Sequence, residues 1–527
     1  MNSFYLTLFI IFVVGVASFS LNSGLNLENN LSLSAKRQFQ EENNIADRTD
    51  DILMGPSLIP PMLIDDLTVQ EQALVKSYLL KVDLRVVPIL GFVYFFAVMD
   101  RANIGAASAN GLREGLNLSK TNAGHITSFF FIAYVAFQAP ANILLKKFSP
   151  HIWFSFIICA WSIVVMCMAA TKTAAAFIAC RFLLGMFECG LTPGVVAYMP
   201  YWYTRSEVGF RMSLFFAAGT LSGVFGGPIA AGLVQHQIGN LAPYNTIFLI
   251  EGALSLFFGI LTYFFIEDYP DKCTFLKEEE REIAVRRISN DQGLASQAKN
   301  SFQSIIAALL DWKVWVYSLM FLAVNIMGTT IGFFSPIIIK ALGHTSTKAT
   351  IYSSFPNLAG FVAQVLSSWT MTAFPLWLNA AVYSLIGLIG AAVSGFVLNN
   401  NTIRLVFLCV FGFGTFPNIP IIATWMSVNS GGISKRMIAS AMTVSFGGAS
   451  GLITPYFNLE EYAPKFRVSF LLNIVSSAFI MFASLVLVAY YKYENARRDR
   501  NPEDVSHLSE DEQRALNDNH PSFRYRL

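Results

Sequence analysis

The chain has 527 residues, of which 54% are hydrophobic and 13% are charged, with a mean hydropathy of +0.50. Soluble domains carry roughly 25% charged residues, so this composition excludes an ordinary soluble globular protein. The net charge is +2, and this near balance argues against a nucleic-acid-binding surface.

An apolar segment, residues 4–19, opens the chain and resembles a secretory signal peptide, although no Lys or Arg precedes it. Cleavage in the lumen would invert every element that follows, against the distribution of basic residues described below. Two interpretations stay open: the segment inserts with its N-terminus outside, or it is an upstream extension and translation starts at Met54 or Met62. We favour the second interpretation.

Long apolar runs separated by short polar connections follow this region. Each run is close to the ~20 residues that a helix needs to cross a ~30 Å hydrocarbon core. The sequence therefore predicts an all-α membrane protein with twelve transmembrane helices in two pseudo-symmetric six-helix bundles. The predicted spans are residues 86–109, 124–145, 152–170, 174–199, 212–234, 244–266, 314–339, 349–371, 376–398, 405–426, 437–457 and 468–491.

A longer connection divides these spans into six and six. We predict an N-terminal tail (1–83), a first bundle (84–266), a central loop (267–312), a second bundle (313–491) and a C-terminal tail (492–527). The halves also resemble each other, since WYTRSEVGFRM leads into the fifth span and WMSVNSGGISKRM into the eleventh. Such repeats are typical of secondary transporters, whose substrate site lies near the membrane midplane between the repeats.

Glycines at a spacing of four mark both of these spans: Gly219, Gly223 and Gly227 in the fifth, and Gly447 and Gly451 in the eleventh. Small residues at this spacing let a neighbouring helix approach closely. The stripes are consistent with static helix packing or with a seam along which the two halves rock, and both interpretations stay open.

The basic residues indicate the orientation of the spans. With both tails on one side, the connections on that side hold 26 of the 36 Lys and Arg residues, and those on the other side hold 8. Cytoplasmic loops retain the positive charge, so both ends of the twelve-helix core are predicted to be cytoplasmic. We expect a monomer in the lipid bilayer of the plasma membrane, with a vacuolar or other internal membrane as the alternative.

Five charged side chains lie well within the predicted spans, all in the first half: Asp100, Arg101, Arg181, Glu188 and Glu251. A charge at the bilayer centre costs roughly 2.5–3.5 kcal/mol, so these groups should pair or line a wet cavity. Arg181 and Glu188 are seven residues apart and share one helix face. Asp100 and Arg101 are consecutive, so one can face a cavity while the other reaches a neighbouring helix.

This pattern favours an anion site coupled to a proton carrier, with a structural ion-pair cluster as the alternative. A substrate carboxylate that binds Arg101 or Arg181 bidentately would displace the acidic partner of that arginine. The displaced carboxyl group, in a poorly hydrated cavity, would then take up a proton. We predict Glu188 as the proton carrier, with Asp100 as the second candidate.

Other polar residues within the spans are weaker candidates. Asn103 extends the polar stripe of Asp100 by one turn, and Glu251 is a possible gate, although a structural hydrogen bond to a neighbouring helix is the simpler interpretation. The second half offers neutral groups to orient a substrate, and the candidates there are Tyr317, Asn325, Asn357, Gln364 and Asn418.

Several functions find no support in the sequence. The chain has no G-x-x-x-x-G-K-[ST] segment for an ATP-driven pump, no cluster with metal-ligand spacing and no G-x-S-x-G motif. We therefore expect no enzymatic activity, no cofactor and no bound metal.

The motifs together resemble the major facilitator superfamily, and more narrowly the fungal allantoate permease branch of the anion:cation symporter family. The resemblance covers residues 84–491 and rests on DLRVVPIL, MDRANIG, LLKKFSPHIW, RFLLGMFECGLTPG, YWYTRSEVGFRM, IEG and SVNSGGISKR. It implies alternating access and cation-coupled or proton-coupled uptake of small organic anions, with Asp100, Arg101, Arg181 and Glu188 in substrate binding and proton coupling. The chain departs from the family between its eighth and ninth spans, where SSWTMTAFPLW lacks the usual charged latch.

Three hypotheses follow. The first is proton-coupled symport of a small carboxylate nutrient, such as allantoate, nicotinate, pantothenate or another vitamin or organic acid. The second is a drug/proton antiporter, against which the intramembrane arginines argue because they disfavour a cationic substrate. The third is a nutrient sensor that binds without translocating, which the uncharged connection after the eighth span suggests.

Overall fold

The computed structural model of the protein describes residues 68–109, 111–117, 120–235, 241–292, 308–343, 346–397, 400–431, 433–458, 465–500, 505 and 516–527. Helices and short connections make up this part of the chain, and no strand occurs in it. The predicted signal-like segment 4–19 and both proposed start residues, Met54 and Met62, lie outside the described residues.

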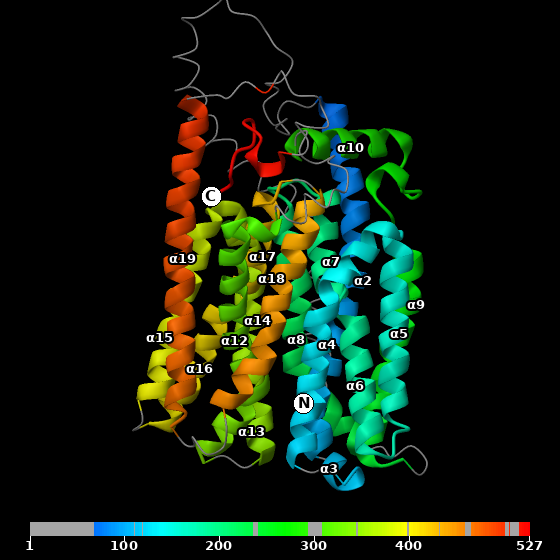
Figure 1. Cartoon of the computed structure of the whole chain (residues 1–527), viewed down its shortest axis with the longest axis vertical. Helices are drawn as coiled ribbons and strands as arrows, with labels where there is room; N and C mark the ends of the chain where they lie inside the picture. Colours follow the sequence, from blue (N-terminus) through cyan, green and yellow to red (C-terminus); the bar gives the residue numbers. More distant parts are fainter. Residues whose placement is uncertain are drawn as a thin grey trace, which may run out of the picture.

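Two helical bundles stand side by side with their helices along the long axis of the molecule (Figure 1). The first contains α2 (Val69–Ala109), α4 (Lys120–Lys147), α5 (Pro150–Met168), α6 (Ala174–Glu188), α7 (Leu191–Tyr198), α8 (Val208–Gln235) and α9 (Pro243–Phe265). The second contains α12 (Trp312–Ala341), α13 (Ser346–Tyr352), α14 (Ser354–Ala373), α15 (Leu376–Phe396), α16 (Asn401–Thr415), α17 (Asn418–Asn429), α18 (Ile433–Ile453) and α19 (Arg467–Arg500).

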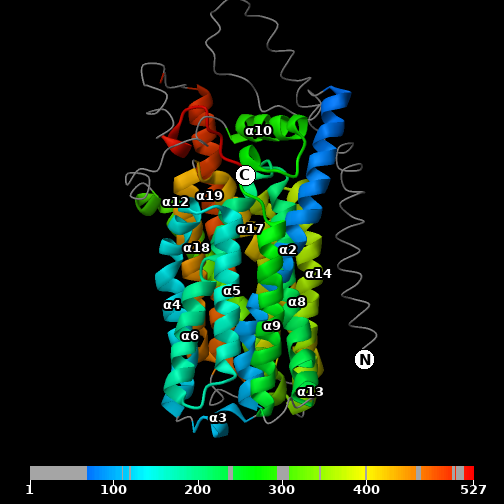
Figure 2. The ribbon, with the colours of Figure 1, turned by 90° about the vertical axis from the view of Figure 1, so that its right-hand side faces the viewer.

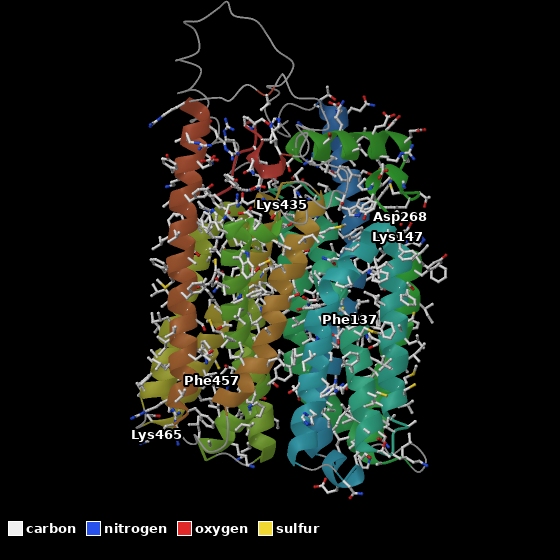
Figure 3. All side chains as sticks on the ribbon, in the orientation of Figure 1. Phe137, Lys147, Asp268, Lys435, Phe457 and Lys465 are labelled. Carbon is white, nitrogen blue, oxygen red and sulfur yellow. The ribbon has the colours of Figure 1, made fainter. Side chains whose placement is uncertain are left out.

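Short elements mark the two ends of the bundles. Helix α10 (Glu278–Gln292) lies across one end, and α3 (Leu112–Gly115) lies at the opposite end with α13 (Figures 1 and 2). We call these the α10 end and the α3 end. Lys147 and Lys435 lie toward the α10 end, and Lys465 lies at the α3 end (Figure 3). One-turn 3₁₀ helices complete the fold: η2 (Met199–Tyr201), η3 (Pro270–Lys272), η5 (Thr454–Phe457) and η7 (Asn517–Asn519).

The predicted fold class, two six-helix bundles without strands, is confirmed. Three of the twelve crossings are broken helices, namely α6 with α7, α13 with α14, and α16 with α17. Ten stretches of the described chain are long and apolar enough to cross a membrane, and the two crossings that fall short are those of α14 and α18. Both are rich in Ser, Thr and Gly and pack against the other bundle, α14 on α8 and α18 on α4, so they need less apolar surface toward lipid.

The first crossing begins earlier than its apolar run. Helix α2 starts at Val69, although the predicted span starts at residue 86. A capping box explains the start: the Thr68 hydroxyl accepts a hydrogen bond from the Glu71 backbone at 3.3 Å, and the Glu71 carboxylate accepts one from the Thr68 backbone at 3.0 Å. The added turns project from the bundle, and the Lys81 ammonium there pairs with Glu280 of α10 at 2.7 Å.

The glycine stripes of α8 and α18 make equivalent contacts. A Cβ atom on Gly219 would lie 2.3 Å from the ring of Tyr94, and one on Gly447 would lie 2.6 Å from the ring of Phe321, each within its own bundle. One turn further on, a Cβ on Gly223 would meet the Asn357 side chain of the opposite bundle at 2.8 Å. On the other side of the seam, Gly451 likewise faces Phe131 of the opposite bundle, where a Cβ would lie 2.2 Å from the ring. The glycines therefore serve packing within each half and close approach between the halves.

Hydrogen bonds close the seam between the bundles from its middle to the α10 end. The Thr220 hydroxyl donates to Gln364 at 2.5 Å, and on the other side of the molecule the Ser445 hydroxyl donates to Gln138 at 2.5 Å. Nearer the α10 end, the Asn142 amide donates to the Met437 carbonyl at 3.0 Å. The bundles are therefore in contact at the α10 end.

Candidate functional site

The centre of the candidate site is an ion pair between the first and fourth crossings. Nε of Arg101, on α2, donates a hydrogen bond to Oε1 of Glu188, the last residue of α6. Nη2 of Arg101 donates to the Tyr134 hydroxyl at 3.2 Å, and the Tyr134 ring lies 4.7 Å from the guanidinium carbon. The Glu188 side chain is fully buried, whereas 17% of the Arg101 side chain is exposed. The arginine can thus be reached from a cavity, and its acidic partner cannot.

Local backbone geometry places these groups. Helix α6 ends at Glu188, before the break that separates it from α7. One turn earlier, a Cβ on Gly185 would lie 2.3 Å from the backbone oxygen of Phe130, so glycine lets α4 approach α6 closely. This approach brings Tyr134 of α4 to the guanidinium of Arg101.

Asp100 and Arg181 form a second, deeper group. Oδ2 of Asp100 accepts a hydrogen bond from the Ser255 hydroxyl of α9 at 3.1 Å, and Nη1 of Arg181 donates to the Asp100 backbone oxygen at 3.4 Å. Both charged side chains are buried, and neither Oδ1 of Asp100 nor Nε of Arg181 has a hydrogen-bond partner among the described residues. The neighbours Asp100 and Arg101 therefore point to different helices, and Arg101 faces the cavity.

Asn103 and Glu251 contact each other inside the first bundle. The Asn103 amide donates a hydrogen bond to Oε2 of Glu251, and both side chains are buried between α2 and α9. Neither residue lines the two cavities described below. The structure thus places Glu251 in a hydrogen bond between helices, outside the linings of these two cavities.

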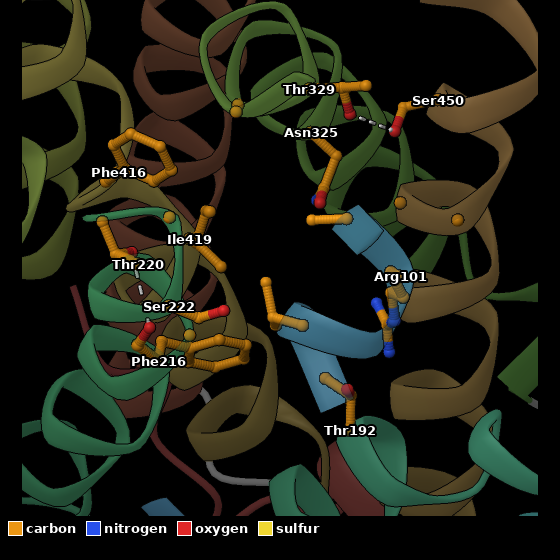
Figure 4. Close-up of a pocket in the computed structure, with 18 of the residues that line it drawn as sticks. Arg101, Thr192, Phe216, Thr220, Ser222, Asn325, Thr329, Phe416, Ile419 and Ser450 are labelled. Atoms are coloured by element: carbon orange, nitrogen blue, oxygen red, sulfur yellow. Dashed lines mark hydrogen bonds between the residues drawn. The ribbon is translucent and has the colours of Figure 1, made fainter. Parts of the chain in front are cut away.

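A central cavity of about 160 Å³ lies between the bundles (Figure 4). Arg101 and Thr192 line it from the first bundle, and Asn325, Thr329 and Ser450 line it from the second. The Thr329 and Ser450 hydroxyls are 3.2 Å apart and form a hydrogen bond. Both halves therefore contribute polar groups to one cavity between the bundles.

A second cavity, of about 360 Å³, continues from the first toward the α3 end. Arg101 lines both cavities, and Arg181 lines the second. Gly105 and Phe333, which also line it, are exposed. The site is therefore open to solvent toward the α3 end, while the α10 end is closed.

The structure places some of the polar candidate residues of the second half in the cavity lining and the others outside it. Asn325 and Asn357 line the central cavity. The other three, Tyr317, Gln364 and Asn418, line neither cavity. The Tyr317 hydroxyl shares a hydrogen bond with the Tyr491 hydroxyl at 2.9 Å, and Gln364 accepts one from Thr220 across the seam. The Asn418 amide donates to the Gly414 carbonyl at 2.9 Å. These three side chains are buried in contacts between helices.

Sequence reasoning missed Tyr134 and Thr192, which line the central cavity beside Arg101. Nothing in an apolar span distinguishes these residues from ordinary packing residues. Gln138 could have been found, because Gln138 and Gln364 occupy matching places in the two repeats and each bonds a hydroxyl across the seam. Comparing the second span with the eighth would have predicted a seam role for Gln364 instead of a substrate contact.

Two bundles that enclose a solvent-accessible cavity at mid-height define a membrane transporter. The sequence profile of the Major Facilitator Superfamily matches residues 90–455. The chain therefore belongs to this superfamily.

Known proteins agree with this assignment. The chain is 28% identical over 436 residues to the MFS transporter prlL of Fungal sp. (strain NRRL 50135), covering 81% of this chain and 88% of that protein. Its fold is similar to that of the proton:xylose symporter XylE, with a TM-score of 0.60, 12% identity and coverage of 77% and 96%. The human organic anion transporter MFSD10 is also similar in fold, with a TM-score of 0.55, 12% identity and coverage of 76% and 99%.

Proposed function

We propose that the protein is a proton-coupled symporter of a small organic anion, in the anion:cation symporter branch that its motifs resemble. The observation that carries this proposal is the pair of Arg101 and Glu188, in which the cavity reaches the guanidinium but not the carboxylate. An incoming carboxylate competes with Glu188 for the same guanidinium, because a planar fork binds carboxylates in this way.

Coupling follows from the burial of Glu188. If the substrate takes over Arg101, Glu188 becomes a buried charge without its partner, which typically costs 3–5 kcal/mol. Protonation of Glu188 removes that cost. Anion binding and proton binding therefore favour each other, and the loaded site carries the same net charge as the empty site. Asp100, which keeps its contacts with Ser255 and Arg181, is the second candidate for the proton carrier.

The distribution of Lys and Arg supports an orientation with the α10 end in the cytoplasm. The open cavity at the α3 end then faces outward, ready for substrate from outside. We propose the plasma membrane as the location, with a vacuolar or other internal membrane as the alternative, and a monomer as the working unit. Proton coupling and organic anion transport both occur on this fold, as the names of XylE and MFSD10 state.

Uptake into proteoliposomes with an imposed pH gradient tests the proposal. Radiolabelled allantoate, nicotinate and pantothenate are suitable first substrates. Acid-driven inward accumulation of an anion is the expected result. Gradient-driven export would instead indicate a drug/proton antiporter, and saturable binding without flux would indicate a sensor.

The variant Glu188→Gln is expected to lose gradient-driven accumulation while retaining counterflow exchange. Glutamine keeps the hydrogen-bonding capacity of the side chain but cannot release or take up a proton. Accumulation and counterflow are measured in the same proteoliposome preparation. Glu278→Gln, on the exposed face of α10, is the control and should behave as the original protein. Unchanged accumulation in Glu188→Gln would show that another group carries the proton.

A further inference from the structure

The lining of the central cavity restricts the chemistry of its ligand. Arg101 is the sole charged side chain among the described residues that line it. Much of the remaining surface is aromatic and comes from both bundles: Tyr94, Phe131, Tyr134, Phe216, Phe321 and Phe416. The cavity thus offers one cation and several ring faces.

The second bundle contributes two amide side chains to the lining, Asn325 and Asn357. Nδ2 of Asn325 donates to the Phe321 carbonyl at 2.7 Å, and Nδ2 of Asn357 donates to the Ser353 carbonyl at 2.9 Å. Because a backbone carbonyl can only accept, these contacts fix the orientation of both amides and use one of the two N–H donors of each. The amide oxygens remain as acceptors for a ligand, and the second N–H of each amide remains as a donor. The amide oxygens can accept a hydrogen bond from an N–H or O–H group of a ligand.

We propose, resting on the function proposed above, that the substrate is a one-ring aromatic monocarboxylate with a hydrogen-bond donor on the far side of the ring. Its carboxylate binds Arg101, its ring lies among the aromatic side chains, and its donor faces Asn325 and Asn357. The volume agrees, since a cavity of roughly 150 Å³ in another protein holds benzene. Aromatic faces are electronegative and repel a second anionic group.

A matched series of ligands tests this inference on the purified protein by titration calorimetry. 4-Hydroxybenzoate should bind at least about tenfold more tightly than terephthalate, which replaces the hydroxyl with a second carboxylate, and than propionate, which lacks the ring. 4-Hydroxybenzamide, which lacks the charge, should bind at least about tenfold more weakly than 4-hydroxybenzoate. Asn325→Leu should remove the preference for 4-hydroxybenzoate over benzoate.

Failure of this inference differs from failure of the proposed function. If terephthalate or propionate binds as tightly as 4-hydroxybenzoate while acid-driven anion uptake is intact, the symporter stands and the aromatic monocarboxylate assignment is wrong. If no carboxylate is accumulated under a pH gradient, the proposed function itself is wrong. Equal affinity for 4-hydroxybenzoate and 4-hydroxybenzamide would contradict carboxylate binding by Arg101, on which both the proposed function and this inference depend.

A second inference concerns the C-terminal segment, residues 516–527, which lies at the α10 end and is drawn in red in Figure 1. The buried Asp518 carboxylate accepts a hydrogen bond from Lys313 of α12 at 2.7 Å and another from Lys435 of α18. Burial by itself raises the pKa of Asp518, but the charges of Lys435 and Lys313 and their hydrogen bonds hold it below its ordinary value. This anchor is therefore ionised at neutral pH.

The segment continues from this anchor to α17 and to the start of α15 in the second bundle. The Arg526 carbonyl accepts hydrogen bonds from the Trp425 indole at 3.0 Å and from the Asn429 amide at 2.9 Å. The Leu527 carbonyl accepts one from the backbone of Leu376 at 3.0 Å, beside the uncharged connection between α14 and α15. Together with the Asp518 anchor, the segment is thus attached to the crossings of α12, α15, α17 and α18 in the second bundle.

The same segment also contacts the first bundle. The guanidinium carbon of Arg205, in the connection before α8, lies 4.5 Å from the centre of the Phe523 ring. Nη1 of Arg205 donates to the Arg524 carbonyl at 3.4 Å, and the Arg205 backbone donates to the Asp291 carboxylate of α10 at 2.7 Å. The segment is therefore attached to the second bundle and also contacts the first. Either its contacts with the first bundle or those with the second must break before the bundles can separate at the α10 end.

We infer that residues 516–527 act as a releasable lock that holds the α10 end closed. Anchoring by Asp518 keeps the segment on the second bundle, and the contact of Phe523 with Arg205 joins it to the first. Opening of the α10 end requires the loss of the Arg205 contacts. The lock therefore sets how often the closed α10 end opens, independently of which substrate the cavity binds.

Spin labels at Val69 and Leu310 in a variant without the six cysteines would report this opening, because both side chains are highly exposed. Val69 begins α2 of the first bundle, and Leu310 lies two residues before α12 of the second. Phe523→Ala and Asp518→Asn should each raise the population of longer label distances at least about twofold. Asp499→Asn, which removes only the exposed partner of Arg524, should leave the distances unchanged.

Thermal unfolding of the same variants separates a lock from a structural support. Phe523→Ala leaves the Asp518 anchor in place, so its folded state should be retained while the distances lengthen. Distance distributions of Phe523→Ala that superimpose on those of the original chain would overturn the inference, whatever the stability of Asp518→Asn.

Discussion

Replacing Arg101 with Gln is expected to reduce the uptake of the organic anion at least about 100-fold. The variant loses two hydrogen bonds to a charged ligand, each worth roughly 1.5–3 kcal/mol, and 1.4 kcal/mol corresponds to a factor of ten. It also removes the ion-pair partner of Glu188, so the ionised form of this fully buried side chain becomes costly. Initial uptake rates and equilibrium binding in the same preparation measure the two effects.

Two companion variants make this expectation specific. Arg101→Lys keeps the charge but lacks the planar fork, so its uptake should fall between that of the original chain and that of Arg101→Gln. In Arg101→Gln combined with Glu188→Gln the buried acid is gone, so the protein should regain thermal stability without regaining uptake. Uptake by Arg101→Gln near the original rate would contradict the placement of the anion at this residue.

The fold was predictable from the sequence because the bilayer imposes a strong pattern. Apolar runs of about 20 residues and the 26-to-8 division of basic residues depend only on hydrophobic length and charge. Helix bounds were less predictable where a polar helix leaves the membrane. The turns of α2 before residue 86 follow a capping box at Thr68, a signal that hydropathy does not contain.

The site was predictable in part, because charge inside a membrane is costly and therefore conspicuous. This argument selected Arg101 and Glu188, which the structure brings together, and it selected Arg181, which lines the second cavity. It could not assign the neutral residues of the second half. The free energy needed to bury an amide such as Gln364 is little greater at the seam between the bundles than in a cavity. Only the residues that contact the amide in the structure therefore distinguish a seam position from a cavity position.

Replacing Gly414 with Ala is expected to destabilise the second bundle strongly. A Cβ at this position would lie 2.1 Å from the backbone nitrogen of Gly387 and 2.7 Å from the backbone oxygen of Tyr383. Both obstacles are backbone atoms of α15, so α16 must move away from α15 as a whole. Overpacking usually lowers the free energy of unfolding by about 1–3 kcal/mol. Because two helices must be displaced here, we expect a loss of about 3 kcal/mol or more.

Gly232→Ala is the matched control, because a Cβ there would meet nothing within 4 Å and the same substitution is made in another helix, α8. Alanine favours a helix over glycine by roughly 1 kcal/mol, so Gly232→Ala should leave the melting temperature unchanged or raise it. Gly414→Ala gains the same propensity, and a fall in its melting temperature therefore reports steric conflict alone. Equal melting temperatures for the two variants would show that α15 and α16 do not approach each other as closely as the structure places them.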